Sequence, residues 1–250
     1  MKSIIVVAAH KKFDVPADSV YLPVQVGAAG KADLGYQRDD MGDNISNRNP
    51  YYCELTGLYW AWKNLDAEYI GLAHYRRFWV RQGVFGKKIL SGKEIDALTN
   101  NSDIIVPKRR NYYIESNYSQ YVHAHNGIVL DYVREVICDL YPHYADAYDE
   151  RMRKSWGHRF NMMIMKRELL DGYCSWLFDV LFELEKRLRA ADDYELEPRV
   201  MGFISERLID VWLDANGLSY KEIPYINTEG ENKLKKGIKM IGRKAAAWRR

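Results

Sequence analysis

Short apolar runs alternate along this chain with segments of helical periodicity, and this alternation constrains the possible folds most. The runs at residues 3–9 (SIIVVAA), 70–73 (IGLA) and 104–107 (IIVP) show no polar/apolar alternation, which is typical of strands buried on both faces. Strands that alternate with helices predict an α/β fold with a mixed, mostly parallel sheet flanked by helices. Such sheets bind ligands beyond the carboxyl ends of their strands.

The segments between the runs carry helix signals. A helix is expected after Asn49, which can act as its N-cap with Pro50 at the first helical position. Ser91 and Glu94 have the spacing of a capping box. Apolar stripes mark the first of these helices and a later, longer one: Leu55, Leu58, Tyr59 and Trp62, then Tyr173, Leu177, Leu181, Leu184 and Leu188.

Size and cysteine usage bound the class of protein. The chain has 250 residues, 47% of them hydrophobic, which is enough for one large core; we expect a single domain over residues 1–230. Cys53, Cys138 and Cys174 are widely spaced and odd in number, which favours reduced thiols over a disulfide framework or a zinc site, and hence a cytoplasmic protein. The first apolar run is too short to span a membrane and is interpreted as a buried strand rather than a signal peptide.

The C-terminal segment, residues 231–250, differs in charge from the rest of the chain. It holds eight Lys or Arg against Glu231, a net charge of +7, so residues 1–230 carry −4 of the total +3. Apolar residues lie between these cations: Leu234, Ile238, Met240, Ile241 and Trp248. The pattern suits an amphipathic helix on an anionic membrane surface; a disordered basic tail is the alternative. Basic ends also bind nucleic acid, but the acidic body shows no nucleic-acid-binding module, so we expect no such partner.

The strand predicted at residues 68–76 (EYIGLAHYR) ends in a cluster of cations. Alternation along a strand would place His74 and Arg76 on one side and Tyr75 and Arg77 on the other, all near its carboxyl end. Two neighbouring guanidiniums repel each other unless an anion lies between them, and a diphosphate matches their bidentate geometry. The alternative is an ordinary pair of surface arginines bound to acidic neighbours.

Several long, tryptophan-rich motifs resemble a known family, the glycosyltransferases of bacterial capsular and exopolysaccharide synthesis once classified as a domain of unknown function. They cover nearly the whole chain apart from its tail: GDNISNRNPYYCELTGLYWAWKN (42–64), YIGLAHYRRFW (69–79), SDIIVPK (102–108), FNMMIMKRELLDGYCSWLFDVLFELEKRL (160–188) and GFISERLIDVWL (202–213). The resemblance implies a GT-A-like nucleotide-diphospho-sugar transferase fold. It also implies transfer of a hexose, such as galactose or galactofuranose, from a UDP-sugar donor to a polyprenyl-linked glycan acceptor.

The resemblance also raises the question of a metal. Typical GT-A enzymes hold a divalent cation on the donor diphosphate with an Asp-x-Asp motif, and His74-Tyr75-Arg76 stands in the corresponding place here. Cationic side chains could neutralise the leaving diphosphate without a metal. Alternatively, His74 is a ligand of Mn²⁺ or Mg²⁺ completed by other residues, or a purely structural histidine.

Further donor-binding residues follow from the same resemblance. The segment GYQRDDMGDNISNRNP (35–50) is similar to an acidic loop of the family whose short acids and amides can grip ribose or sugar hydroxyls: Asp39, Asp40, Asp43, Asn44 and Ser46. Without the resemblance, this segment would be interpreted as a solvated turn. By analogy with GT-A folds, His10 and Lys11 at the end of the first strand would meet the uracil.

Glycosyl transfer with inversion needs a carboxylate that receives the proton of the acceptor hydroxyl, whereas retention usually needs a different arrangement near the anomeric carbon. Asp103 and Glu206 lie inside the family-like motifs and are the candidates; Glu206 could instead pair with Arg207, and Asp103 could cap a turn. Three residues are candidates for acceptor binding: His123, His125 and Asn161. The two histidines lack a convincing third partner for a metal site.

These observations predict a cytoplasmic glycosyltransferase, peripheral on the inner face of the plasma membrane, which extends a lipid-linked polysaccharide. A non-catalytic module that binds a nucleotide sugar or an anionic glycan is the alternative.

Overall fold

The computed structural model describes residues 2–84, 86–192 and 194–229. A ten-stranded sheet forms its centre, with the main order β11-β7-β10-β4-β1-β2-β3. The strands are β1 (Ser3–Ala9), β2 (Tyr21–Gln25), β3 (Gln37–Arg38), β4 (Tyr69–His74), β5 (Arg77–Gly83), β6 (Gly86–Ile89), β7 (Ile104–Pro107), β10 (Met163–Lys166), β11 (Lys221–Ile223) and β12 (Tyr225–Asn227). Strands β8 (Arg110–Asn111) and β9 (Trp156–Gly157) form a separate pair.

The helices are α1 (Asn49–Tyr52), α2 (Leu55–Asn64), α3 (Gly92–Thr99), α4 (Asn117–Val122), α5 (Ile128–Leu140), α6 (Ala145–Arg153), α7 (Arg167–Ala190) and α8 (Val200–Ala215). Short 3₁₀ turns lie at Ser46–Arg48 and Pro142–Tyr144.

The central strands run mostly parallel. β1 pairs in parallel with β2 and with β4, so that Val6 lies opposite Leu22 on one side and Leu72 on the other. β7 and β11 are also parallel, whereas β10 runs antiparallel to both β4 and β7. The predicted mixed, largely parallel sheet is therefore confirmed.

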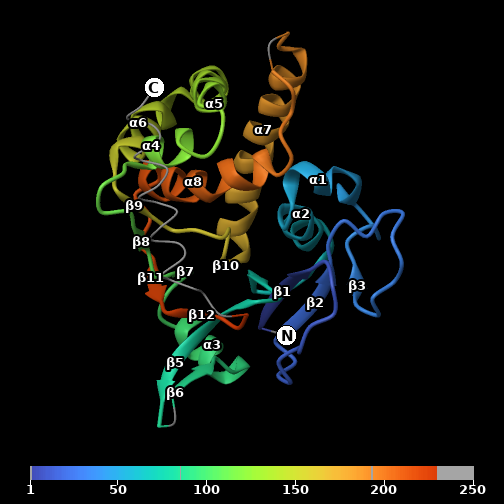
Figure 1. Ribbon diagram of the computed structural model, residues 1–250. Coiled ribbons are helices and arrows are strands. Elements are labelled where there is room, and N and C mark those ends of the chain that lie inside the picture. Colours follow the sequence, from blue (N-terminus) through green and yellow to red (C-terminus); the bar gives the residue numbers. More distant parts are fainter. Residues whose placement is uncertain (1, 85, 193, 230–250) are drawn as a thin grey trace.

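Apolar side chains of the central strands pack on both faces of the sheet. One face contacts α2, α7 and α8 through residues such as Val6 and Leu72, and the opposite face contacts the β5–β6 hairpin and α3 through Val7 and Ile164. Figure 1 shows these two layers, with α7 and α8 above the sheet and α3 and the hairpin below it. This burial on both sides is why the strands read as continuous apolar runs.

Three local predictions were wrong because the chain breaks where a continuous element was expected. β4 ends at His74, and Tyr75 and Arg76 form a two-residue turn from which β5 returns antiparallel, with Arg77 opposite His74. The segment YKEIPYI (220–226), which the sequence predicts as a single last strand, is divided at Pro224 into β11, beside β7, and β12, beside β5.

The third break lies in the helix expected after Asn49. Cys53 has a φ of 52° and separates α1 from α2. Asn49 is the first residue of α1 rather than an N-cap, and its side-chain amide donates to the Cys53 carbonyl (2.8 Å) and to Thr56 Oγ1 (3.2 Å). It therefore joins the two short helices across the break.

Other local predictions are confirmed. Ser91 and Glu94 form the capping box of α3, the stripe from Tyr173 to Leu188 is buried along α7, and the three cysteines are free. None of the helices within the described residues combines the length and the hydropathy that a membrane-spanning segment requires. The predicted amphipathic tail, residues 231–250, lies outside the described residues, so the domain boundary at residue 230 stays a prediction.

Candidate active site

A cleft of about 670 Å³, which we call the first cleft, opens at the carboxyl ends of β1 and β4. Its walls come from the ends of these two strands, the α1–α2 break, the loop before β10 and the first turns of α8. The lining includes Ala8, His10, Lys31, Cys53, Glu54, His74, Tyr75, Arg76, Arg77, Phe160, Arg199, Phe203 and Glu206. This is the edge at which open α/β sheets bind ligands.

The β4–β5 turn brings the predicted cation cluster into this cleft. Because the chain reverses at Tyr75 and Arg76, the residues from His74 to Arg77 all line the cleft instead of alternating between two faces. The guanidinium of Arg77 lies 4.1 Å from the ring centre of Phe160. The Nη1 of Arg76 lies 3.5 Å from a carboxylate oxygen of Glu229, and its buried Nε has no hydrogen-bond partner among the described residues.

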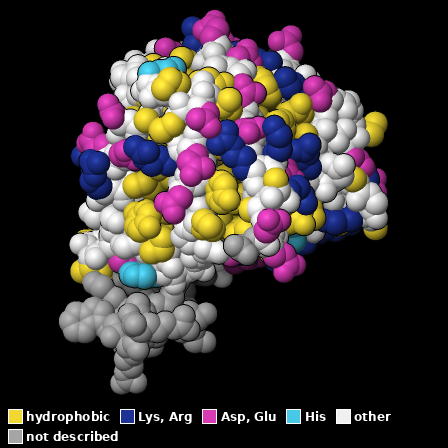
Figure 2. Space-filling model, turned by 90° about the horizontal axis from the view of Figure 1, so that it is seen from above, with side chains coloured by type: hydrophobic (Ala, Val, Ile, Leu, Met, Phe, Trp, Pro, Cys, Tyr) yellow, Lys and Arg dark blue, Asp and Glu magenta, His cyan; other side chains and the backbone are white. Residues whose placement is uncertain are grey.

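Positive charge dominates the lining of the first cleft. Lys31, Arg76, Arg77 and Arg199 face it, against the carboxyl groups of Glu54 and Glu206. On the outer face shown in Figure 2, by contrast, Lys and Arg side chains lie interspersed with Asp and Glu. Concave surfaces lined by one sign of charge attract ligands of the opposite sign, so this cleft favours an anion.

Glu54 and His74 meet at the bottom of the first cleft. Glu54 Oε1 lies 3.9 Å from His74 Nε2, and their side chains are only 12% and 13% exposed. Burial, together with the nearby Arg77, lowers the pKa of His74 to about 4. Burial also raises the pKa of Glu54. Both shifts favour the neutral forms, so the imidazole stays uncharged at neutral pH and can hydrogen-bond the Phe160 carbonyl at 2.5 Å.

Asn161, which was predicted to bind the acceptor, instead holds Glu54. Its amide nitrogen donates to Glu54 Oε1 (2.7 Å) and to the Gly202 carbonyl (3.1 Å), and its Oδ1 accepts from Ser205 Oγ (2.9 Å). It is 2% exposed, with a left-handed φ of 52°. All its polar atoms are therefore engaged, and it acts on the site through the orientation of Glu54.

Glu206 joins the first cleft to a second one. The second cleft, about 300 Å³, shares Phe160, Phe203 and Glu206 with the first and is otherwise lined by Arg110, Tyr112, Glu115, Gln120, His123, Ala124, His125, Arg159 and Arg207. The Phe160 N–H donates to Glu206 Oε1 at 3.1 Å, which fixes the carboxylate at this junction. A carboxylate between two clefts can contact groups bound in both.

The predicted acceptor residues His123 and His125 both line the second cleft. Each faces a different carboxylate: His123 Nδ1 lies 2.7 Å from Glu115, and His125 Nδ1 lies 3.7 Å from Glu197. The two histidines therefore do not form a shared metal site.

The acidic segment from Asp39 to Ser46 serves mainly to hold its own loop. Asp39 is fully buried and accepts from the N–H groups of Gly27 and Ala28, from Ser46 Oγ and from Thr56 Oγ1. The other predicted donor residues of this segment are also engaged: Asp40 with Arg38, Asp43 with Tyr59, and Asn44 with the Ser46 N–H. None of these predicted residues is among those lining the first cleft, and their geometry fits the turn interpretation.

The remaining predicted residues lie in different places. His10 lines the first cleft, whereas Lys11 lies at its margin, paired with Glu229 at 2.7 Å. Asp103 precedes β7 and accepts a hydrogen bond from Tyr69 at the start of β4. β4 and β7 run in the same direction because both are antiparallel to β10. Asp103, which precedes β7, therefore lies at the amino ends of these strands, at the edge of the sheet opposite the first cleft. It is not brought together with the other candidates.

Sequence reasoning missed Glu54, Lys31 and Arg199. Glu54 carries a weak signal, since it is an acid inside the apolar segment YYCELTGL. Arg199 has a left-handed φ of 67° at the start of α8, and its N–H donates to the Pro50 carbonyl at 2.8 Å. This contact between segments 149 residues apart could not be read from a local pattern.

The residues of the first cleft do not suit a divalent cation. Among the described residues, no group of three or more His, Cys, Asp or Glu side chains is arranged to hold a metal ion. Arg76 and Arg77, which follow His74 in the turn, present guanidiniums that repel cations and donate hydrogen bonds, and burial favours the neutral form of the nearby Glu54. The chemistry of the site is therefore derived from these side chains.

Two comparisons relate the chain to known proteins. Residues 4–217 match the family model described as "Domain of unknown function (DUF4422)". The solved structure of the WbbM bifunctional glycosyltransferase in its apo form superposes with a TM-score of 0.81 at 28% sequence identity, over 92% of this chain and 46% of that one. The chain thus spans about half the length of that protein. No protein of curated function matches the sequence.

Proposed function

The chain belongs to the DUF4422 family, and from this membership, its likeness to a glycosyltransferase and the geometry of its two clefts we propose that it is itself a glycosyltransferase. It moves a hexose, galactose in pyranose or furanose form, from a UDP-sugar to a lipid-linked glycan in the synthesis of a bacterial surface polysaccharide. The observation that carries the proposal is the junction at Glu206, where a cleft lined by four Lys or Arg side chains meets a second cleft.

In this proposal the first cleft holds the UDP-sugar. The guanidiniums of Arg76 and Arg77 bind the diphosphate, and Lys31 and Arg199 add positive charge to the same cleft. Their charge stabilises the diphosphate as it leaves, without a divalent cation. The neutral His74 and its partner Glu54 lie at the bottom of the cleft and hydrogen-bond the sugar.

The second cleft holds the acceptor. An acceptor hydroxyl there attacks the anomeric carbon of the donor sugar, the bond from that carbon to the diphosphate oxygen breaks, and the bonding electron pair leaves with UDP. Glu206 receives the hydroxyl proton. Its position at the junction of the two clefts supports this role over that of Asp103, which lies at the other edge of the sheet.

Membrane attachment belongs to the proposal as well. The basic segment at residues 231–250 would hold the protein on the anionic inner face of the plasma membrane, near its polyprenyl-linked acceptor. Removal of residues 231–250 would then abolish binding to anionic liposomes and leave the transfer to a soluble acceptor largely intact.

Release of UDP tests the proposal. The protein is incubated with UDP-galactose or UDP-galactofuranose, with and without Mn²⁺ and a glycan acceptor, and UDP and product are measured by mass spectrometry. Acceptor-dependent product in the presence of a chelator supports the whole proposal. Binding of the UDP-sugar with no release of UDP under any of these conditions would instead indicate a non-catalytic binding module.

A further inference from the structure

The second cleft contains two buried guanidiniums that make no direct contact with a carboxylate of the described residues. Arg159 is 4% exposed and Arg207 is 5% exposed, and both line this cleft. Among the described residues, neither makes an ion pair; every hydrogen-bond acceptor that contacts them is neutral. Buried charges without a counter-charge are costly, so their presence here requires a reason.

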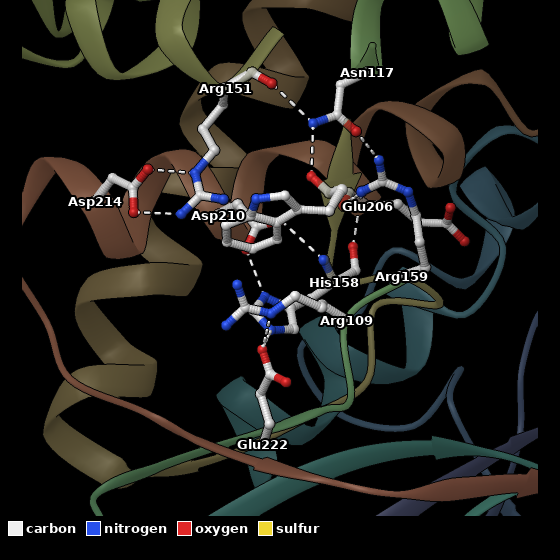
Figure 3. A network of polar contacts seen from close by, with 10 residues as sticks. Arg109, Asn117, Arg151, His158, Arg159, Glu206, Asp210, Asp214 and Glu222 are labelled. Atoms are coloured by element: carbon white, nitrogen blue, oxygen red, sulfur yellow. Dashed lines mark hydrogen bonds and ion pairs between the residues drawn. The ribbon is translucent and has the colours of Figure 1, made fainter. Parts of the chain in front are cut away.

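Arg159 belongs to a network in which the other cations are paired. In Figure 3, Arg151 faces Asp214 and Arg109 faces Glu222. Arg159 instead contacts the Asn117 amide oxygen and the carbonyls of His158 and Glu206, the last two at 2.8 Å. It also donates to the Tyr112 hydroxyl. Arg151 and Arg109 thus each have a carboxylate partner, whereas Arg159, which lines the cleft, has none among the described residues.

Arg207 is similarly placed. Its Nη1 donates to the Phe203 carbonyl at 2.7 Å, its Nη2 donates to Gln120 Oε1, and its Nε has no hydrogen-bond partner among the described residues. Burial, together with repulsion by Arg159, lowers the pKa of Arg207 to about 10. The two guanidiniums therefore act on each other inside one cleft.

Two carboxylates, Glu115 and Glu206, also line this cleft, and neither forms an ion pair with Arg159 or Arg207; Glu206 acts on Arg207 only through its charge. Glu115 contacts His123 at 2.7 Å, and Glu206 accepts from the Phe160 N–H at the junction with the first cleft. Planar guanidiniums match the geometry of carboxylate and phosphate oxygens. We propose that Arg159 and Arg207 bind an oxyanion carried by the acceptor, either a sugar carboxylate or a phosphate ester, and so select an anionic acceptor.

The proposal rests on the proposed function in calling the ligand an acceptor, whereas anion binding can be measured without turnover. The probes are potassium glucuronate for a sugar carboxylate, inorganic phosphate for a phosphate ester, and galactose as a neutral control, each added to the full chain at constant ionic strength. Thermal unfolding and calorimetric titration report binding, because a ligand that binds only the folded state raises its stability.

The decisive variant is Gln120→Glu. It places a carboxylate against the Nη2 of Arg207 with almost no change in shape. We expect a higher melting temperature without ligand and an affinity for the anionic probe weakened about tenfold or more, since the internal carboxylate replaces the external one. Arg207→Gln should weaken the same binding by a similar factor; if this variant fails to fold, Gln120→Glu still decides the question.

Two controls match these variants. Gln82→Glu makes the same change at an exposed position of β5 and should leave anion binding unaltered. Phosphate can also enter the first cleft, so Arg76→Gln is tested alongside. This variant should keep the phosphate binding that belongs to the second cleft, which Gln120→Glu removes.

A response to glucuronate or to phosphate that Gln120→Glu removes supports the proposal and identifies the source of the oxyanion. Equal responses to galactose and to the anions, or an anion response that survives Gln120→Glu, would overturn it. UDP titration of the same proteins keeps the two proposals separate. If UDP binds and the anion response is absent, only the proposal of an anionic acceptor fails. If the anion binds and UDP does not, only the assignment of the first cleft to the UDP-sugar fails.

Discussion

Glu54 and His74 face each other across 3.9 Å at the end of β4, each almost buried and each with its pKa shifted toward the neutral form. An apolar strand and a helix break, 20 residues apart in the chain, thus place an acid and a base together at the bottom of a cationic cleft.

The first prediction concerns pH. Between pH 6.5 and about 4 the unfolded chain binds a proton at His74 that the folded chain rejects, so the free energy of unfolding falls as pH drops through this window, by up to roughly 3 kcal/mol. Glu54 has the opposite sign: above pH 4.5 the unfolded chain releases a proton that the folded chain retains, so stability falls as pH rises.

Urea unfolding from pH 4 to pH 8 checks both signs. Relative to the wild type, His74→Gln should gain stability toward low pH, and Glu54→Gln should gain stability toward high pH. Parallel pH profiles for the three proteins would contradict the assignment of neutral forms to this pair.

The second prediction concerns the diphosphate. Arg76→Gln or Arg77→Gln should weaken UDP binding about tenfold each, because each removes charge-assisted hydrogen bonds. Uridine, which lacks phosphate, should bind all variants equally. Arg81→Gln is the matched control: Arg81 lies on β5 as well, but pairs with Glu94 away from the cleft. Unchanged UDP affinity in both cleft variants would contradict the assignment of the diphosphate to Arg76 and Arg77.

The third prediction concerns Glu206. Glu206→Gln keeps an oxygen that can accept from the Phe160 N–H but cannot receive the acceptor proton, so turnover should fall about 10²–10⁴-fold while UDP affinity is retained. Asp103→Asn should keep normal turnover, since Asp103 lies at the other edge of the sheet. Steady-state kinetics and UDP titration separate the two effects, and the reverse result would transfer the role of base to Asp103.

The fourth prediction concerns Glu229, whose carboxylate contacts Lys11 at 2.7 Å and Arg76 at 3.5 Å. These ion pairs compete with an external phosphate for the same cations. Glu229→Gln should therefore raise UDP affinity about two- to threefold at low salt, and the gain should shrink as salt screens the charges. Glu168→Gln, at a position 77% exposed, should have no effect. A loss of affinity in Glu229→Gln would show that this acid supports the site instead.

The fifth prediction concerns Asp39 as a structural residue. Asp39→Asn replaces an acceptor of four hydrogen bonds by an amide that opposes one of the donors, so the free energy of unfolding should fall by about 2–4 kcal/mol. Asp40→Asn, at the partly exposed Arg38 pair, should cost less than about 1 kcal/mol. Equal urea midpoints for the two variants would contradict this role.

Sequence periodicity determined the parts of this protein that depend on neighbours in the chain. The apolar runs identified β1, β4 and β7, and the stripe from Tyr173 to Leu188 identified α7, because burial on both faces of a sheet, or on one face of a helix, leaves a local pattern. The same logic placed Arg76 and Arg77 beyond a strand end, although the turn that directs both into one cleft was not foreseen.

Only the tertiary structure decided which of the charged residues form the site. Glu54 and Glu206 line one cleft although 152 residues separate them, Asp103 is carried to the opposite edge, and Asp39 turns out to hold a loop. The same is true of Arg159 and Arg207, whose lack of a carboxylate partner within residues 2–84, 86–192 and 194–229 is visible only once their neighbours are in place. Periodicity records how each segment is buried, whereas the surroundings of a charge depend on contacts between distant segments, which leave no local pattern.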